Sequence, residues 1–561
     1  MTSVYDQKPW LQHYSPWVPP ELKIPKENLI QVLKRAVSER GSSPAIFYFG
    51  CHLSYAEIER FSDSLAAALQ DMGLKKGDRI VFYMQNIPQF VIAQYAVWKA
   101  GGIVVPLNPM FKEKELEYYF QDSGAKMLIT LASTYEATAK NVAEKLKIKS
   151  VISCSGLDFL HPKDPIPKVL LGEGSKKFPE TLDFLELLKK YDGQVPDPVE
   201  VLPQEPAYLT YTSGTTGPPK GAMNTHGNVV FSAMIYRHCF KLGYQDVVLG
   251  VAPLFHVTGQ VCALACAAYS GIPVILFFRF DPEEAIRLVE RWKATMIVGS
   301  ITVFIALMNH PEIRKRDFST MKKVLSGGAP VSPAIVETFE KTCGAYIHNV
   351  YGMTETTSPS HFTPFGGRSP VDPDTGALSV GLPVPNTLVK IMDVETGNKE
   401  LPPGELGEIV IKGPQVIPGY WNKPEETNHA IRDGWIYSGD VGKMDENGWF
   451  YVVDRKKDLI NASGYKVWPR DVEDVLYQHP AVKEASVIGV PDSYRGETVK
   501  AFVALKDGFE KVTSIELIDF CKKRMAAYKY PRTVEIVPEI PKTVTGKFLR
   551  RVLREQNRGG T

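Results

Sequence analysis

The residues best suited to chemistry lie in a stretch rich in hydroxyls and glycines at positions 210–221, which reads Thr-Tyr-Thr-Ser-Gly-Thr-Thr-Gly-Pro-Pro-Lys-Gly. Glycines tolerate positive φ, so their backbone N–H groups can converge on an anion. The hydroxyls can donate hydrogen bonds, and Lys220 adds a positive charge that suits phosphate. The stretch is therefore a candidate phosphate loop, although it does not match G-x-x-x-x-G-K-[ST], and a solvated Ser/Gly/Pro linker is the alternative.

Two later segments add groups that could hold a nucleotide. Residues 324–330 end in Ser-Gly-Gly-Ala-Pro, a turn whose backbone can approach a flat base closely. Residues 348–356 read His-Asn-Val-Tyr-Gly-Met-Thr-Glu-Thr. In that segment an aromatic ring can stack on a base, a hydroxyl can bond a phosphate oxygen, and a carboxylate can hold Mg²⁺.

Several other polar residues are ambiguous on their own. His256 follows a strand-like pattern at 247–252, where a lone histidine is usually a satisfied structural residue. Asp440 would ordinarily cap a turn, the charge cluster at 454–458 would ordinarily be a solvated loop, and the basic C-terminal tail would ordinarily be solvated. The helical pattern at 260–270 carries small side chains, which either leave volume beside the helix or simply allow close packing on a sheet.

Alternating strand and helix patterns must position these groups. Helical patterns begin at Asn28 and cover 55–72, 88–100 and 226–242. Buried-strand patterns cover 80–84, 101–106, 126–129, 150–152 and 207–211. Strand–helix–strand order with glycine punctuation implies parallel βαβ units with right-handed crossovers. Strand-like segments from 406 onward indicate a β-rich subdomain, and the end of the chain reads as an α+β lobe.

The composition narrows the class of protein. The 561 residues are enough for several domain cores, and 44% hydrophobic and 23% charged residues are ordinary for a soluble globular protein. The formal net charge of +2 gives no indication of a nucleic-acid partner. No apolar run is long enough for a membrane span, and the first residues lack a signal-peptide pattern. The seven scattered cysteines form no disulfide or CxxC pattern, so we expect a reduced, soluble, cytoplasmic protein.

Together these motifs resemble those of the adenylate-forming superfamily, which includes acyl-CoA synthetases, 4-coumarate–CoA ligases, beetle luciferases and the adenylation domains of peptide synthetases. The resemblance covers nearly the whole chain. It implies an α/β fold with a large N-terminal adenylation domain at 1–454, built of βαβ layers plus a β-rich subdomain. It also implies a hinge at 455–458 and a small, mobile α+β C-terminal domain at 459–561 that carries the catalytic lysine.

The resemblance assigns roles in nucleotide binding and catalysis. The residues implied in ATP or AMP binding are Thr212, Ser213, Gly214, Thr215, Thr216, Gly217, Lys220, Gly328, Ala329, Pro330, Asn349, Tyr351, Thr354, Asp440, Arg455 and Lys547. Within this set, Tyr351 is expected to stack on adenine and Asn349 to reach its amino group. Asp440 is expected to accept both ribose hydroxyls, which Arg455 also bonds. The implied catalytic residues are Lys547, His256, Thr354 and Glu355, and the implied metal ligands are Glu355 and Thr212.

The resemblance also implies where coenzyme A and the acyl group lie. The implied residues of the CoA path are Ser463, Gly464 and Lys466, and the implied hinge residue is Lys457. The acyl pocket is expected to involve His256, Ala267, Val303, Phe304 and Val350. Val350 departs from coumarate-type ligases, which carry glycine there, and a β-branched side chain would narrow or redirect the pocket.

The implied activity is that of an AMP-forming acyl-CoA ligase, which uses ATP, Mg²⁺ and coenzyme A. The carboxylate of the substrate attacks the α-phosphorus of ATP, and the CoA thiol then attacks the acyl carbon of the adenylate while AMP leaves. Because two anions must meet, the protein must hold them in line and neutralise charge, for which Lys220 and Lys547 are available. A small domain beyond a hinge can swing between the two steps.

The opening Lys-Pro-Trp-Leu at 8–11 and the segment 118–124 most resemble medium- to long-chain fatty-acid–CoA ligases. Aryl acids such as coumarates and short or branched acids are alternatives, and a luciferase-like oxidoreductase or a non-catalytic acyl-adenylate binder is less favoured. The expected partners are a small-molecule carboxylic acid, ATP and CoA, with no nucleic acid. A homodimer and peripheral membrane contact are left open.

Overall fold

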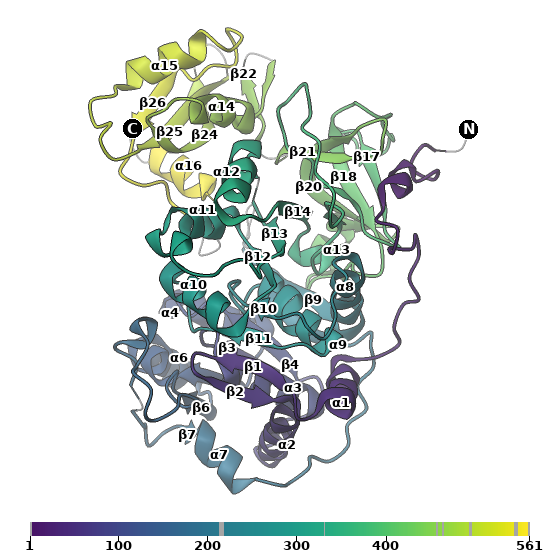
Figure 1. Ribbon diagram of the computed structural model, residues 1–561, viewed down its shortest axis with the longest axis vertical. Helices are drawn as coiled ribbons and strands as arrows, with labels where there is room; N and C mark the ends of the chain where they lie inside the picture. Colours follow the sequence, from purple (N-terminus) through teal and green to yellow (C-terminus); the bar gives the residue numbers. More distant parts are fainter. Residues whose placement is uncertain are drawn as a thin grey trace.

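The computed structural model describes residues 3–174, 176–212, 218–329, 331–455, 458–462, 465–492, 496–542 and 548–558. Figure 1 shows a large body of layered sheets and helices, with a smaller lobe of helices and strands at the top, where the C-terminus lies. A β-rich part, labelled β17 to β21, lies beside that lobe. This arrangement confirms the predicted fold class, an α/β protein with a β-rich subdomain and a small α+β lobe.

The first sheet carries the strand that leads into the predicted phosphate loop. Its order is β7 (Leu182–Asp183), β6 (Ser150–Cys154), β5 (Met127–Leu131), β3 (Arg79–Tyr83), β4 (Ile103–Leu107), β8 (Pro206–Tyr211) and β9 (Gly221–Thr225). Its strands pair in parallel, except β8 with β9. Helix α3 (Pro88–Lys99) connects β3 to β4 and is buried on all sides, as expected of a helix between two layers. The predicted βαβ unit is therefore present.

The second sheet carries the candidates for adenine binding. Its order is β16 (Leu382–Pro383), β15 (His361–Phe362), β14 (Ile347–Tyr351), β13 (Lys323–Gly327), β12 (Met296–Gly299), β10 (Val248–Leu249), β11 (Val274–Leu276), β1 (Pro44–Tyr48) and β2 (Cys51–Ser54). Helices α1 (Leu29–Arg40), α8 (His226–Cys239) and α9 (Cys266–Ser270) contact one another. One cluster of buried apolar side chains includes Phe82 of the first sheet and Val324 of the second, so both sheets share a core.

Two further sheets form the β-rich part and the small lobe. The third consists of β17 (Leu388–Met392), β18 (Gly407–Lys412), β20 (Trp435–Met444) and β19 (Ile431–Arg432), with β21 (Phe450–Arg455) paired to β20. The fourth consists of β23 (Tyr465–Val467), β22 (Ile460–Ala462), β25 (Gly496–Leu505) and β24 (Val482–Asp492), with β26 (Thr533–Ile536) paired to β25.

The helices of this lobe are α14 (Pro469–Tyr477), α15 (Ser514–Lys522) and α16 (Arg550–Arg558). The other helices are α2 (Tyr55–Asp71), α4 (Glu113–Ser123), α5 (Ala132–Thr134), α6 (Lys140–Leu146), α7 (Phe184–Lys190), α10 (Pro282–Trp292), α11 (Ile301–Asn309), α12 (Pro333–Cys343) and α13 (Pro424–Ala430).

Two element ends differ from the sequence predictions. The helix expected at 226–242 ends at Cys239, because Lys241 adopts a left-handed φ of 48° that cannot continue it. The strand expected at 247–252 is only β10, because the N–H of Val251 turns back to the carbonyl of Leu249 at 3.0 Å.

The helix expected at 260–270 begins as a π-helix (Gly259–Ala265) before α9. A Cβ on Gly259 would lie 2.2 Å from the Pro253 carbonyl oxygen, so only glycine allows the helix to start this close to the preceding turn. The π-helix is wider than an α-helix, and such segments are frequent at functional sites.

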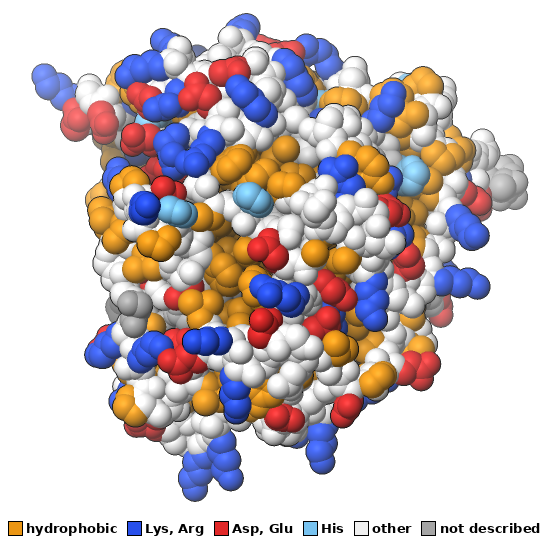
Figure 2. Space-filling model, turned by 60° about the horizontal axis from the view of Figure 1, so that its bottom comes forward, with side chains coloured by type: hydrophobic (Ala, Val, Ile, Leu, Met, Phe, Trp, Pro, Cys, Tyr) orange, Lys and Arg blue, Asp and Glu red, His pale blue; other side chains and the backbone are white. Residues whose placement is uncertain are grey.

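The surface shows mixed charge on the face drawn in Figure 2. Basic and acidic side chains are interspersed there, and apolar side chains gather between them near the middle of the view. Within the described ranges, no helix is both long enough and apolar enough to cross a lipid bilayer.

Candidate active site

The ends of the predicted phosphate loop are held together by a β-hairpin. Tyr211 and Gly221 face each other across β8 and β9, and the N–H of Thr212 donates to the carbonyl of Lys220 at 2.9 Å. On the far side, the hydroxyl of Tyr118 donates to the carbonyl of Pro219 at 2.7 Å. The loop residues Ser213, Gly214, Thr215, Thr216 and Gly217 lie outside the described residues. The hairpin therefore presents a loop with fixed ends, as a phosphate loop requires.

A short 3₁₀ turn, Thr354–Thr356, follows β14 and carries two predicted site residues. The side-chain amide of Asn224 in β9 donates to the carbonyl of Thr354 at 2.9 Å and to the hydroxyl of Thr357 at 2.9 Å. Because Asn224 lies just after the phosphate loop, these bonds tie the loop's exit strand to the turn that carries Glu355. The structure thus brings together two motifs that are far apart in the sequence.

Lys220 and Glu355 both contact one tyrosine, Tyr420. The Glu355 side chain is buried, and its Oε1 accepts a hydrogen bond from the hydroxyl of Tyr420 at 2.8 Å. The ammonium nitrogen of Lys220 lies 5.0 Å from the centre of the Tyr420 ring, within cation–π range. Burial, together with the Glu355 carboxylate, raises the pKa of Tyr420, so its hydroxyl stays a donor at neutral pH.

The adenine candidates lie at the ends of β13 and β14. Gly328 has a φ of 80°, which allows the turn after β13, and Ala329 is half-buried. Pro330 lies outside the described residues. The side-chain amide of Asn349 is buried and donates to the carbonyl of Ser379 at 3.0 Å, so at least part of its hydrogen-bonding capacity is used within the fold.

The ribose candidates face each other in the β-rich sheet. Asp440 lies within β20, not in a turn, and is paired across the antiparallel ladder with Arg455 of β21. The carboxylate of Asp440 accepts a hydrogen bond from the hydroxyl of Tyr351 at 2.6 Å. The structure therefore brings the predicted ribose ligand and the predicted adenine-stacking ring into contact.

His256 is half-buried in the turn before the π-helix. Its Nδ1 accepts from the N–H of Thr258 at 3.3 Å and lies 3.1 Å from the Thr258 hydroxyl. A nitrogen that accepts from a backbone N–H carries no proton, so a neutral His256 ring is protonated on Nε2.

The predicted acyl-pocket residues are dispersed over several elements. Phe304 is buried and its ring packs edge-on against Phe339, with centroids 5.4 Å apart. The carbonyl of Ala267 accepts from the hydroxyl of Tyr55 at 3.2 Å, as expected of close helix packing. Val303 is half-buried, and Val350 is buried in β14. Their role in acyl binding stays a prediction.

The predicted CoA and hinge residues are only partly covered by the structure. Ser463, Gly464, Lys457 and Lys547 lie outside the described residues. Lys466 belongs to β23, where its backbone is paired with Asn461, and its side chain is not described.

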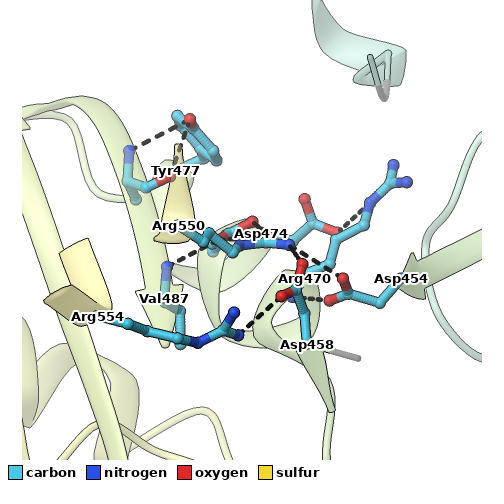
Figure 3. Close-up of polar contacts among 10 residues, drawn as sticks. Asp454, Asp458, Arg470, Asp474, Tyr477, Val487, Arg550 and Arg554 are labelled. Carbon is cyan, nitrogen blue, oxygen red and sulfur yellow. Dashed lines mark hydrogen bonds and ion pairs between the residues drawn. The ribbon is translucent and has the colours of Figure 1, made fainter. Parts of the chain in front are cut away.

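A buried charge network surrounds the predicted hinge (Figure 3). The guanidinium of Arg550 in α16 contacts Asp454 at 3.1 Å, Asp458 at 3.1 Å and both carboxylate oxygens of Glu473 at 2.8 and 2.9 Å. Arg554 also contacts Asp458, at 2.7 Å. Burial alone would lower the pKa of Arg550, but the three carboxylates raise it overall, so this guanidinium stays charged.

Two side chains of the charge cluster, Asp454 and Asp458, are buried and so do not lie in a solvated loop, which was the alternative for this segment. The basic tail is not simply solvated either, because Arg550 is largely buried among carboxylates.

The sequence prediction missed Asn224, Tyr420 and Arg550 as residues that support the site. Nothing in the local pattern around Asn224 pointed to the turn at Thr354. Tyr420 belongs to the Gly-Tyr-Trp sequence at 419–421, and the only signal there was an aromatic hydroxyl next to a glycine in the predicted β-rich subdomain. Arg550 lay in a tail whose composition resembled that of a solvated segment.

Comparison with known proteins agrees with this geometry. Residues 33–421 match the family described as AMP-binding enzyme, and residues 471–547 match the AMP-binding enzyme C-terminal domain. The chain therefore belongs to the AMP-binding enzyme family, and the predicted resemblance to adenylate-forming enzymes is confirmed.

Individual relatives span almost the entire chain. A long-chain-fatty-acid–CoA ligase of Bacillus subtilis is 39% identical over 563 residues, with 98% of each chain covered. A feruloyl-CoA synthase of an Amycolatopsis species is 34% identical, covering 91% of this chain and 95% of the relative. The crystal structure of ATP-bound MatB from Rhodopseudomonas palustris is 27% identical, with a TM-score of 0.81, covering 95% of this chain and 99% of that one.

Proposed function

We propose that this protein is an AMP-forming fatty-acid–CoA ligase that acts on long-chain fatty acids. It activates a carboxylic acid with ATP to an acyl adenylate and pyrophosphate, and then transfers the acyl group to the thiol of coenzyme A. The observation that carries the proposal is the meeting of separate motifs at one site, where Tyr420 links Lys220 to Glu355 and Tyr351 contacts Asp440. The family membership and the long-chain-fatty-acid–CoA ligases among the relatives support it.

The first step requires two anions to approach each other. We assign Lys220, at the exit of the phosphate hairpin, to the phosphates, to which it would offer positive charge. We assign Asp440 to the ribose hydroxyls and Tyr351 to the base, and the contact between these two side chains supports that assignment. Lys547 is proposed to reach the same phosphates from the small lobe. Catalysis in this scheme is mainly alignment and charge neutralisation.

Glu355 fits the role of a metal ligand. Among the described residues no cluster of three or more His, Cys, Asp or Glu side chains could hold a metal alone. Magnesium at phosphate sites usually needs only one or two carboxylates together with phosphate oxygens, so the single buried carboxylate of Glu355 suffices, with Thr212 as a second candidate. Magnesium bound there would neutralise part of the negative charge on the phosphates.

The second step requires the small lobe to move. We assign residues 1–454 to a large adenylation domain, 455–458 to a hinge with Lys457 at its centre, and 459–561 to a small domain. Asp454, just before this hinge, and Asp458, its last residue, contact the same arginine, which supports a junction held by side chains as well as by backbone. Ser463, Gly464 and Lys466 would then line the path of coenzyme A. ATP and CoA as substrates also agree with a cytoplasmic location.

One relative suggests a second class of carboxylic acid as the substrate, the aryl acids. The feruloyl-CoA synthase is nearly as similar to this chain as several of the fatty-acid ligases. Val350, buried at the end of β14, argues against it, because a β-branched side chain would take up space that a flat ring needs. Thioester formation should therefore be measured with saturated acids of increasing length and with ferulate, each with and without CoA. A preference for long saturated acids supports the proposal, whereas a preference for ferulate would replace it with an aryl–CoA ligase.

A further inference from the structure

We infer that Tyr420 is a positioning residue that contacts both Glu355 and Lys220 and keeps them available to the phosphate–metal site. The inference deepens the proposed function and rests on it. No group on Tyr420 needs to touch a reacting atom, so it acts through its two neighbours.

The backbone around Tyr420 is fixed to the strand that leaves the phosphate loop. The N–H of Trp421 donates to the carbonyl of Gly221 at 2.8 Å, and the N–H of Met223 donates to the carbonyl of Gly419 at 3.1 Å. These bonds form an antiparallel bridge between Ala222 and Tyr420. The segment thus adds a short extra strand to β9, directly after Lys220, and Tyr420 moves with the loop's exit.

A second set of bonds fixes Tyr420 relative to the turn that carries Glu355. The N–H of Ile417 donates to the carbonyl of Glu355 at 3.0 Å. The N–H of Tyr420 donates to the hydroxyl of Thr427 at 2.9 Å, and a Cβ on Gly419 would lie 2.6 Å from the Thr427 side chain. The segment is therefore clamped on both sides, so its aromatic side chain has little freedom to shift.

The hydroxyl of Tyr420 orients the carboxylate of Glu355. Tyr420 and Glu355 are only 6% and 8% exposed, and the bond from Oη to Oε1 is 2.8 Å long. A carboxylate oxygen that accepts a hydrogen bond from a fixed donor is restricted in rotation. With Oε1 held, Oε2 is the oxygen left to meet a cation.

Tyr420 gives each of two opposite charges a partner of its own. Lys220 lies over the ring at 5.0 Å from its centre, and no ion pair between Lys220 and Glu355 is formed in the described part of the chain. If the two side chains paired directly, each would satisfy the other and neither would be available to phosphate or metal. The tyrosine gives Lys220 a weaker cation–π partner and gives Glu355 a neutral donor, so both charges stay available.

The test is isothermal titration of the full-length protein with ATP, once with Mg²⁺ and once with EDTA. Tyr420→Phe keeps the ring over Lys220 and removes only the hydroxyl. We expect ATP with Mg²⁺ to bind about tenfold more weakly to this variant, and ATP with EDTA to bind as it does to the wild type. Equal weakening under both conditions, or no weakening, would overturn the inference.

A matched control variant distinguishes the loss of Glu355 positioning from the general effect of removing a buried tyrosine hydroxyl. Tyr451→Phe also removes a buried hydroxyl that donates to a carboxylate, that of Asp445 at 2.9 Å, within the β-rich sheet. Its ATP affinity should not change under either condition. Adding Tyr420→Phe to Glu355→Gln should cost no further Mg²⁺-dependent affinity, because the tyrosine acts through Glu355; additive losses would contradict this. Failure of the wild type to bind ATP would instead contradict the proposed function.

Discussion

The hydroxyl of Tyr351 donates a hydrogen bond of 2.6 Å to the carboxylate of Asp440. Tyr351 ends β14 of the second large sheet, and Asp440 lies within β20 of the β-rich sheet, 89 residues further along the chain. Asp440 is only 2% exposed, so its carboxylate is held in a fixed position. A base stacked on Tyr351 would therefore have its ribose close to Asp440.

We predict that Asp440→Asn weakens AMP and ATP binding by about 10- to 100-fold, because the amide nitrogen replaces one acceptor oxygen, whether it faces the ribose hydroxyls or the Tyr351 hydroxyl. Titration calorimetry with AMP measures this loss. The wild type should also discriminate against 2′-deoxy- and 3′-deoxy-ATP, and the variant should discriminate less. Unchanged discrimination in the variant would show that Asp440 does not hold the ribose.

Lys547 should matter for only one of the two steps. We predict that Lys547→Ala abolishes adenylate formation, by at least about 100-fold, and largely spares thioester formation from supplied acyl adenylate and CoA, because its charge is needed only while phosphate charge develops. Lys457→Pro should affect the thioester step more, because it stiffens the hinge. Both half-reactions can be followed separately, by pyrophosphate release and by thioester formation. Equal loss of both in Lys547→Ala would contradict the assignment.

We expect the contacts of Arg550 both to stabilise the small lobe against unfolding and to hold the hinge in place. Glu473 and Arg550 both belong to the small lobe, and the Glu473 carboxylate also accepts from the N–H of Val487 at 2.8 Å. Arg550 keeps Asp454 and Asp458 as partners in Glu473→Gln, so we expect the loss of the charged hydrogen bonds to Glu473 to cost about 1.5–3 kcal/mol. We therefore predict that Glu473→Gln clearly lowers the melting temperature of the small lobe, measured by calorimetry.

Asp454 contacts the same arginine from the other side of the hinge, and it also accepts from the N–H of Arg470 at 3.0 Å. Asp454→Asn keeps an acceptor for that N–H and weakens the bond to Arg550. We predict faster tryptic cleavage at the basic hinge residues in this variant, with little change in melting temperature. If the two variants behaved alike in both assays, the distinction between hinge and lobe contacts would be wrong.

Buried histidines should make the fold acid-sensitive. Burial lowers the pKa of His226 and of His361 to about 3, and that of His348 to about 4. The unfolded chain would bind these protons near the ordinary value of 6.5, so stability is fully present above pH 6.5 and is lost as the pH falls towards the folded values. Each histidine contributes a slope of about 1.4 kcal/mol per pH unit in that window.

His226→Gln tests this slope without touching the nucleotide site. His226 accepts from the N–H of Leu29 at 3.4 Å, and a glutamine oxygen can replace that acceptor. Urea unfolding at pH 7 and at pH 5 should show a smaller loss of stability in the variant than in the wild type. An identical pH dependence would mean that this histidine is not buried in its neutral form.

Local pattern was enough to predict much of the fold. The run at 80–84 and the helix after it were predictable because most of their residues are apolar; β3 is buried from Ile80 to Tyr83, and α3 is buried along its whole length. The glycine of the adenine turn was predictable because only such a residue takes the φ of 80° found at Gly328. The catalytic motifs were recognised because their residue types are nearly unique in combination.

What could not be predicted depends on contacts between distant segments. The meeting of Tyr420 with Glu355 results from pairing between the 419–421 segment and β9, which no local pattern reveals. The burial of Arg550 depends on three carboxylates from two other segments. The short β10 and the π-helix reflect backbone turns at Val251 and Gly259 that are set by neighbouring strands.

The central claim is that a carboxylic acid and ATP react on this protein to give an acyl adenylate. The most direct measurement is the exchange of labelled pyrophosphate into ATP by the full-length protein with Mg²⁺ and without CoA. We predict exchange that requires an added fatty acid, increases with chain length and is lost in Lys547→Ala. Absence of acid-dependent exchange with every saturated, branched or aryl acid tried would contradict the claim.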